Sequence, residues 1–149
     1  MTINSRAKGS CAELEFSNIV YQWSGVRLIR NLEQSRSGGH DLIVHADEVG
    51  PVADSFRALA IEVKRHAKAT PGLIKVWWQQ ALEQGESNGL IPILAYRADR
   101  CDWQVVAPLH LINATMVRNM GLDSTCSVSV MGFCRVIDIS AHSNCINPK

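Results

Sequence analysis

The sequence Ile61-Glu62-Val63-Lys64-Arg65 closes an apolar-rich run from Phe56 that is typical of a buried β-strand. Side chains alternate across a strand, so Glu62 and Lys64 share one face while Val63 points to the other. A carboxylate and an ammonium are costly to bury on a mostly apolar strand without a purpose. Binding of a magnesium ion would be such a purpose, because magnesium favours oxygen ligands and takes one or two protein carboxylates. The plainer interpretation of a Glu-x-Lys tripeptide is a solvated strand edge with an incidental ion pair.

Length and composition indicate one ordinary globular domain. The chain has 149 residues, of which 46% are hydrophobic and 19% charged, enough for a sizeable core. No run approaches the roughly 18 apolar residues of a transmembrane helix. Met1 to Ser10 is polar and basic, without the apolar centre of a signal peptide. We therefore expect a cytoplasmic protein with no membrane partner.

The five cysteines form an odd set without secretory context, which favours reduced thiols over a disulfide framework. By residue type, a zinc set could be drawn from Cys126, Cys134, His142 and Cys145. Their separations by seven, seven and two intervening residues fit no compact pattern of paired cysteines. Buried or free thiols are the favoured interpretation.

The net charge of +1 does not by itself indicate a nucleic-acid binder. Up to Lys75, ten Lys or Arg stand against eight Asp or Glu, and three of those acids are candidate metal ligands. A bound divalent ion would offset part of their charge and leave a basic surround. That surround comprises Arg27, Arg30, Arg36, Lys64, Arg65 and Lys68. It is compatible with a phosphate-backbone partner.

Hydrophobic periodicity predicts a first helix over Cys11 to Trp23, with Ser10 as its N-cap and Gly25 as its stop. Its apolar stripe comprises Ala12, Phe16, Ile19, Val20 and Trp23. Strands are expected at Val26–Leu32, His40–Val44, Ser55–Arg65, Leu90–Tyr96 and Trp103–Ala107, and a second helix at Leu73–Gln84. This α-β-β-β-α-β-β order indicates an α+β fold, in which helices flank a mixed central β-sheet and the first three strands form an antiparallel meander.

The later part of the chain carries further expectations. The buried face of the second helix comprises Leu73, Val76, Trp77 and Ala81. Adjacent Trp77 and Trp78 are not expected to face the core together; packing at a helix–sheet seam is the favoured use for both, with a loop, a subunit or a nucleobase as the alternative for one of them. Pro92 indicates a strand end or a sheet edge. Beyond Pro108 the pattern weakens, with a helix expected at Leu109–Met120 and β-like stretches within Cys126–Ile139.

Three acids stand on separate elements: Glu13 on the first helix, Asp41 on the second strand and Glu62 on the third. If these strands pair, Asp41 and Glu62 can converge on one cation, and an adjacent helix could add Glu13. Periodicity alone does not choose between Glu13 and Glu15, and either could simply complement the helix dipole. The constellation suits phosphodiester hydrolysis, in which a metal polarises the phosphoryl oxygen and lowers the pKa of an attacking water.

The ordered set resembles the PD-(D/E)xK nuclease superfamily, which has a restriction-endonuclease-like α-β-β-β-α-β core, Asp on the second strand and Glu-x-Lys on the third. Lys8-Gly9 followed by Glu13 looks like the opening of archaeal-type Holliday junction resolvases. The runs that look like small resolvase-like proteins of phages and prophages are Asn31–Gln34, Gly38–Leu42, Ile61–Arg65, Trp77–Ala81 and Pro92–Arg97. The resemblance covers about Arg6 to Ile112. We therefore expect a nuclease domain over residues 1–112 and a C-terminal extension of unknown role over residues 113–149.

The resemblance implies a site for Mg²⁺ or Mn²⁺. Its ligands would be Asp41, Glu62 and the Val63 carbonyl, with Glu13 completing the site from the first helix. Lys64 would orient the nucleophilic water or steady the phosphate, and Gln80 would support the site from the second helix. The proline of the family motif is His40 here. The expected DNA-binding residues are Lys8, Arg30, Ser35, Arg36, Arg65 and Lys68, with Ser35 to Ser37 near the scissile phosphate.

The expected function is that of a Mg²⁺-dependent, structure-selective DNA endonuclease that resolves four-way (Holliday) junctions and is encoded by a phage or prophage. Paired incisions on a two-fold symmetric branched DNA imply a homodimer. The alternatives are a nuclease for flaps, ends or single strands, and a non-catalytic nuclease-fold DNA-binding protein. The complete acid–acid–lysine set argues against the last alternative, because a pure binder has no need to keep mutually repelling carboxylates together.

Overall fold

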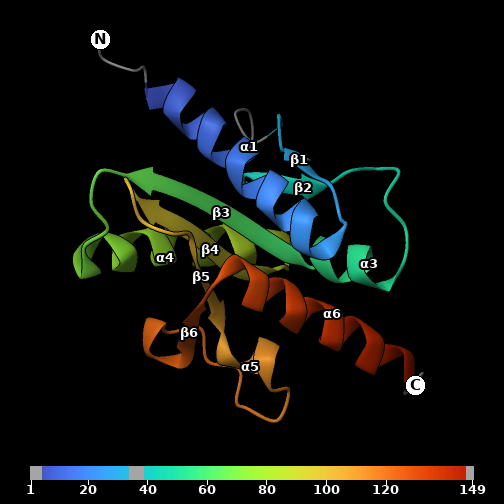
Figure 1. The fold of residues 1–149 in the computed structure, drawn as a ribbon. Helices are drawn as coiled ribbons and strands as arrows, with labels where there is room; N and C mark the ends of the chain where they lie inside the picture. The colour runs from blue at the N-terminus through green and yellow to red at the C-terminus, as the bar shows by residue number, and fades with distance from the viewer. Residues whose placement is uncertain (1–4, 34–38, 147–149) are drawn as a thin grey trace.

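The computed structural model describes residues 5–33 and 39–146 (Figure 1). The helices are α1 (Ser5–Ser24), α3 (Pro51–Arg57), α4 (Pro71–Asn88), α5 (Leu109–Ile112) and α6 (Val130–Ile146). The strands are β1 (Leu28–Arg30), β2 (Leu42–Val44), β3 (Leu59–His66), β4 (Ile91–Ala98), β5 (Gln104–Pro108) and β6 (Thr125–Val128). Within the described residues they form one sheet in the order β1-β2-β3-β4-β5-β6, in which only β3 and β4 run parallel. The predicted α+β class, mixed sheet and antiparallel β1-β2-β3 meander are confirmed.

Helix α1 lies across one face of the sheet beside α6 (Figure 1). The predicted stripe holds for Ala12, Phe16 and Val20, which are buried in the main core, but Trp23 is 53% exposed. The helix begins at Ser5, so Ser10 lies inside it and is not the N-cap. Gly25 ends it as predicted. Its φ of 73° lies in the left-handed region that glycine tolerates, and its N–H donates to the Tyr21 carbonyl at 2.8 Å.

The predicted third strand, Ser55–Arg65, is wrong over its first four residues, 55–58, and right from Leu59 onward. Helix α3 occupies this part, because Pro51 is well placed in a first helical turn and Asp54 and Arg57 form an ion pair at 2.8 Å along it. Phe56 is therefore a helical core residue, which meets Phe133 of α6 edge-on with ring centroids 6.0 Å apart. Strand β3 begins only at Leu59.

Helix α4 covers the other face of the sheet over β3 and β4 (Figure 1). Both Trp77 and Trp78 are buried, contrary to the prediction, whereas Val76 is 54% exposed. The loop before β6 makes this possible, because the Trp78 indole N–H donates to the Met120 carbonyl at 2.9 Å while Trp77 packs on the sheet. Pro92 is the second residue of β4, so the strand-end prediction holds, but β4 is an interior strand rather than an edge.

Residues beyond 112 complete the sheet and the main core. Strand β6 pairs with β5, and α6 packs against α1 and α3. Four buried side chains of α6 belong to the main core: Val130, Phe133, Cys134 and Ile137. The helix expected at Leu109–Met120 is only the short α5, and most of the β-like segment Cys126–Ile139 is helical. None of the helices in the described part of the chain has the length and apolar character to cross a lipid bilayer.

The packing of α6 predicts a large stability loss in Phe133→Ala. Phe133 is 1% exposed, so its truncation should lower the free energy of unfolding by about 3–5 kcal/mol. Ile139 of the same helix is 65% exposed, so Ile139→Ala should change the free energy of unfolding by less than about 0.5 kcal/mol. Urea unfolding followed by circular dichroism measures both. Equal small effects would show that α6 is not part of the core.

Candidate active site

A cleft of about 390 Å³ opens beside β3, where β2 diverges from it and the N-terminal half of α1 passes over. Its lining comprises Lys8, Gly9, Glu13, Asp41, Glu62, Val63, Lys64, Arg65 and His66. The structure thus gathers the three predicted acids, the lysine and two of the predicted DNA-binding residues in one place. They come from α1, from the residue that precedes β2 and from residues 62–66 of β3, which are separate segments of the sequence.

Asp41 is fixed by hydrogen bonds to β3. Its backbone N–H donates to the Ile61 carbonyl at 2.9 Å, and its Oδ2 accepts the Val63 N–H at 2.7 Å. The carboxylate therefore takes the place that the next backbone carbonyl of β2 would occupy in a regular ladder. The N–H and C=O of one strand residue point to the same side, so the Val63 carbonyl faces the gap that β2 leaves. Asp41 is 7% exposed.

Glu62 and Lys64 lie together on the α4 face of β3, as strand alternation predicts. The Lys64 Nζ is 2.6 Å from Glu62 Oε1, and Glu62 is only 3% exposed. The other carboxylate oxygen, Oε2, is buried without a hydrogen-bond partner among the described residues. A buried, unpartnered carboxylate oxygen beside a second carboxylate is a costly arrangement that a cation would relieve.

The glutamine that acts on Glu62 is Gln84, one helical turn beyond the predicted Gln80. Gln80 is exposed on α4, whereas Gln84 is half-buried, and its side-chain hydrogen bond is among the interactions that lower the pKa of Glu62. The Oε1 atom of Gln84 is itself buried without a partner in the described chain. Gln80 and Gln84 follow the buried Trp77 by three and seven residues, and both are helical spacings, so the sequence does not choose between them.

The charge of Asp41 raises the pKa of both cleft glutamates, Glu62 and Glu13. Burial and then the charge of Asp41 raise the pKa of Glu62, and together they outweigh the lowering by Lys64 and Gln84. Burial also raises the pKa of Glu13; the hydrogen bond from Arg30 opposes this rise, and the charge of Asp41 adds to it. A site in which carboxylates are held together against their own repulsion is suited to bind a positive charge.

The two glutamates of α1 have different surroundings. Glu13 lines the cleft and forms an ion pair with Arg30 of β1. Glu15 lies among Arg97, Arg65 at 3.5 Å and the Trp103 indole N–H at 3.1 Å, outside the lining of this cleft. The geometry thus separates a cleft glutamate from a structural one, which periodicity alone could not do.

The residues present fit a hard divalent cation. Asp41, Glu62 and the Val63 carbonyl offer oxygen donors, and Glu62 Oε2 is an unpartnered one. Across residues 5–33 and 39–146, no three His, Cys, Asp or Glu side chains form a complete metal-binding group. Mg²⁺ usually combines one or two protein carboxylates with water and substrate oxygens. The role of Glu13 as a further ligand stays a prediction.

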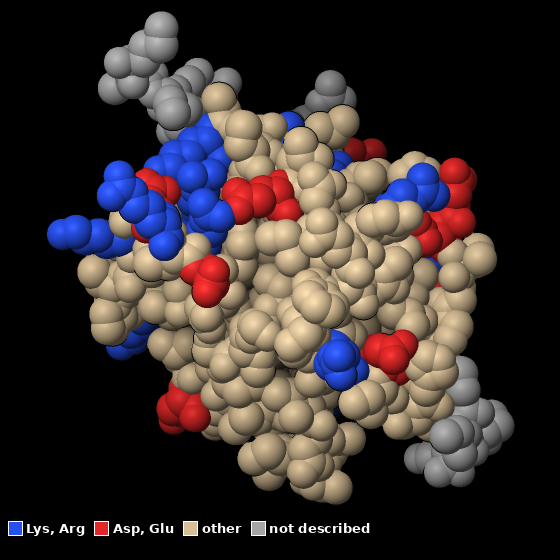
Figure 2. Space-filling model, viewed as in Figure 1, with Lys and Arg blue, Asp and Glu red and all other residues tan. Residues whose placement is uncertain are grey.

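The predicted DNA-binding residues have varied positions. Lys8 and Arg65 line the cleft and share Asp99 as an ion-pair partner, at 3.3 and 3.2 Å. Arg30 is held by Glu13, and Lys68 is exposed beyond the end of β3. The predicted Ser35 and Arg36, together with Ser37, lie outside the described residues. Figure 2 shows Lys and Arg gathered at the end of the molecule where α1 begins and β3 ends.

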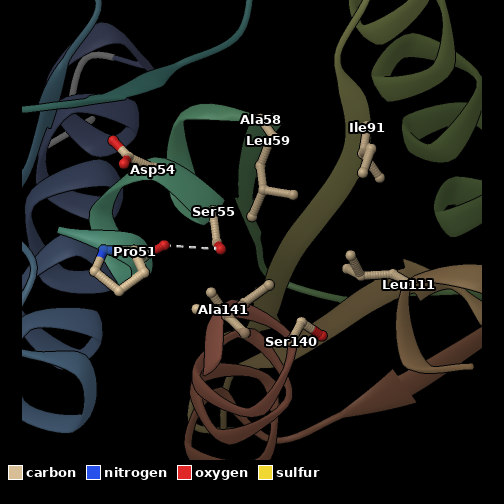
Figure 3. A pocket seen from close by; sticks show the side chains of 10 residues that line it. Pro51, Asp54, Ser55, Ala58, Leu59, Ile91, Leu111, Ser140 and Ala141 are labelled. Carbon is tan, nitrogen blue, oxygen red and sulfur yellow. Dashed lines mark hydrogen bonds between the residues drawn. The ribbon is translucent and has the colours of Figure 1, made fainter. Parts of the chain in front are cut away.

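A second cavity, of about 410 Å³, lies at the opposite end of β3, between α3, α6 and the start of β4 (Figure 3). Its walls are mainly apolar, with Leu59, Ile91 and Leu111 prominent, and Asp54 is its one charged lining residue in the described chain. The Ser55 hydroxyl donates to the Pro51 carbonyl at 2.9 Å. With one charged residue in its lining, this second cavity lacks the converging charges that phosphodiester chemistry needs.

Two cysteines of the C-terminal part, Cys126 and Cys134, are free thiols. Cys134 is 2% exposed in the main core, and burial raises its pKa to about 12. Cys126 is partly buried and its Sγ donates to the Ala107 carbonyl at 3.7 Å. A thiol with a strongly raised pKa is a poor source of the thiolate that zinc requires.

The sequence model of the family described as "Phage putative PDDEXK endonuclease" matches residues 4–133 of the chain. This chain belongs to that family. The predicted membership of the PD-(D/E)xK superfamily is thereby confirmed, and the protein is a nuclease of the PDDEXK type. The match extends past residue 112, where the resemblance drawn from motifs ended, through β6 and into α6.

A solved structure is also similar to this chain, and it is Hjc, a Holliday junction resolvase from the archaeal hyperthermophile Archaeoglobus fulgidus. The two chains share 15% sequence identity with a TM-score of 0.43, over 85% of this chain and 96% of that one. No curated protein matches the sequence.

The raised pKa of Glu62 predicts that Glu62→Gln stabilises the metal-free protein at neutral pH. A carboxyl with a raised native pKa binds its proton more tightly in the folded protein than in the unfolded chain. The wild type therefore loses stability as the pH rises from about 4.3 through the native pKa. Glutamine does not titrate. In EDTA, the Tm of Glu62→Gln should therefore exceed that of the wild type by more at pH 7.5 than at pH 4.

The matched control is Glu86→Gln, which alters an exposed glutamate of α4. Its Tm difference from the wild type should be small and similar at both pH values. A Tm for Glu62→Gln that falls below the wild type at pH 7.5 would show that the Lys64 ion pair outweighs the cost of burying the charge.

Proposed function

We propose that this chain is a Mg²⁺- or Mn²⁺-dependent, structure-selective DNA endonuclease that resolves four-way junctions as a homodimer. The observation that carries the proposal is the Asp41 carboxylate bonded to the Val63 N–H beside the unpartnered Oε2 of Glu62, at the floor of a cleft that also holds Lys64. This arrangement supplies acid oxygens for a cation and an ammonium for a phosphate or a water.

The metal would be held by Asp41, Glu62 and the Val63 carbonyl, with Glu13 as a further ligand from α1. When bound, it would polarise the scissile phosphoryl oxygen and lower the pKa of a nucleophilic water. Lys64 offsets the charge of Glu62 and still has N–H donors for water or a phosphate oxygen. Gln84 acts on Glu62 from α4 and restricts where its carboxylate can lie.

The charge of the cleft favours a polyanion once its cation is bound. Three acids (Glu13, Asp41, Glu62) and three bases (Lys8, Lys64, Arg65) line it, so their formal charges cancel. A divalent ion adds two positive charges and makes the lining net basic. Arg30 and Lys68 would extend the contact along the DNA, and Ser35 and Arg36 are proposed to lie near the scissile phosphate.

The branched substrate and the two-fold dimer rest on the resemblance to junction resolvases. Paired, symmetric cuts need two clefts related by a two-fold axis, which one chain does not supply. A phage- or prophage-encoded enzyme of this kind would act in the host cytoplasm. Flaps, DNA ends or single strands are the alternative substrates, and a binder without turnover is the alternative outside enzymes.

A cleavage assay tests the reaction and the substrate together. A labelled four-way junction and the matching linear duplex are incubated with Mg²⁺ or with EDTA. We expect symmetric, Mg²⁺-dependent nicks in the junction, reduced by at least ~100-fold in Asp41→Asn and Glu62→Gln because both substitutions remove a metal ligand. Arg135→Ala, an exposed position on α6, should leave the rate unchanged.

Equal cutting of both DNAs would retain the nuclease and remove the junction assignment. Tight, salt-sensitive binding without cutting under any metal would favour the non-catalytic DNA-binding protein.

Metal binding has its own measurement. A cation that binds only the folded site raises stability in proportion to RT ln(1 + [L]/Kd). Titration with Mg²⁺ or Mn²⁺ should therefore raise the Tm of the wild type progressively, and this rise should be lost in Asp41→Asn. Arg135→Ala should respond as the wild type does. An equal rise in Asp41→Asn would place the bound cation elsewhere.

A further inference from the structure

His66 is the single aromatic residue among the described residues that line the cleft with Asp41 and Glu62. Its ring lies 4.8 Å from that of Trp77, with the planes inclined at 42°, and Trp77 lies 6.0 Å from Tyr96. Trp77 is 4% exposed, whereas His66 is exposed. Trp77 thus contacts both other rings, and His66 is the exposed ring of the three, at the edge of the cleft.

The position of His66 is fixed by the strand that carries the active-site residues. It is the last residue of β3, and its carbonyl accepts the Asp99 N–H at 2.9 Å. Alternation along β3 places Glu62, Lys64 and His66 on one face, so His66 follows Lys64 by about 7 Å along the strand. A group held by Lys64 would therefore have His66 as its neighbour.

The structure gives the His66 ring no polar partner. Within the described part of the chain, its nitrogens form no hydrogen bond or ion pair, and its one contact of note is with Trp77. Trp77 restricts the orientation of the ring on one side and leaves the remainder open to solvent at a cleft rimmed by Lys8, Lys64 and Arg65. An open aromatic surface beside basic side chains that can hold a phosphate backbone is a combination with which proteins bind unpaired nucleotides.

We propose that His66, supported by Trp77, is a stacking site for an unpaired nucleobase next to the scissile phosphate. This inference rests on the proposed nuclease function and narrows its substrate class. In a continuous duplex every base is already stacked and paired, so the site offers such DNA no added affinity. A nucleotide freed at a branch point, flap or mismatch gains the stacking contact, and its neighbouring phosphate lies beside Lys64.

The test compares two DNAs that differ in one nucleotide. Both carry the fluorescent base 2-aminopurine next to the cleavage position, unpaired in one and paired with thymine in the other. Binding is measured in EDTA or Ca²⁺, so that it does not depend on cleavage. We expect the wild type to quench the unpaired probe and to prefer the unpaired DNA.

Three variants distinguish stacking from other roles. His66→Ala should weaken binding of the unpaired DNA by roughly 5- to 150-fold and abolish the quenching, with little effect on the paired DNA. His66→Phe keeps an aromatic face without ring nitrogens and should stay within about threefold of the wild type in both readouts. His142→Ala, an exposed histidine on α6, is the matched control and should behave as the wild type.

Each contrary result has a definite meaning. Equal losses on both DNAs in His66→Ala, or a His66→Phe variant as defective as His66→Ala, would overturn stacking and indicate a polar contact to the backbone. Quenching that depends on His66 in a protein that cuts no DNA would retain the stacking site and remove the nuclease proposal. Cleavage of branched DNA without quenching would retain the nuclease proposal and remove the stacking site.

Discussion

The bond from the Val63 N–H to the Asp41 carboxylate is the constraint on which the cleft depends. At 2.7 Å it replaces a backbone ladder bond, and it does so where β2 stops pairing with β3. One interaction therefore ends the pairing of two strands, fixes a carboxylate next to Glu62 and leaves the Val63 carbonyl facing the gap. The irregularity of the sheet at this point is what makes room for chemistry.

The surrounding charges are arranged to hold the acids without neutralising them. Arg30 pairs with Glu13 and Lys64 with Glu62, yet the pKa of both glutamates stays raised because burial and the Asp41 charge prevail. Glu15 and Asp99 take up Arg65, Arg97 and Lys8 at the rim, so the basic groups there are positioned before any partner arrives. The fold thus keeps the carboxylates together at the floor of the cleft and basic side chains at its rim.

Sequence patterns predicted what depends on short-range spacing and missed what depends on distant packing. Alternation along one strand was enough to place Glu62 beside Lys64, and the family resemblance located Asp41 and preferred Glu13 to Glu15. Helix α3 was missed because Phe56, which contacts α6, has the same apolar character in a strand as in a helix. Trp78 needed the Met120 carbonyl from a loop more than 40 residues away, and no local pattern contains that contact.

The packing of α6 on α1 joins segments separated by 105 intervening residues, from Ser24 to Val130. A ribosome delivers α1 early and α6 much later, so the apolar face of α1 lacks its neighbour during most of translation. The helix that carries Glu13 therefore gains its packing against α6 only after most of the chain has been synthesised.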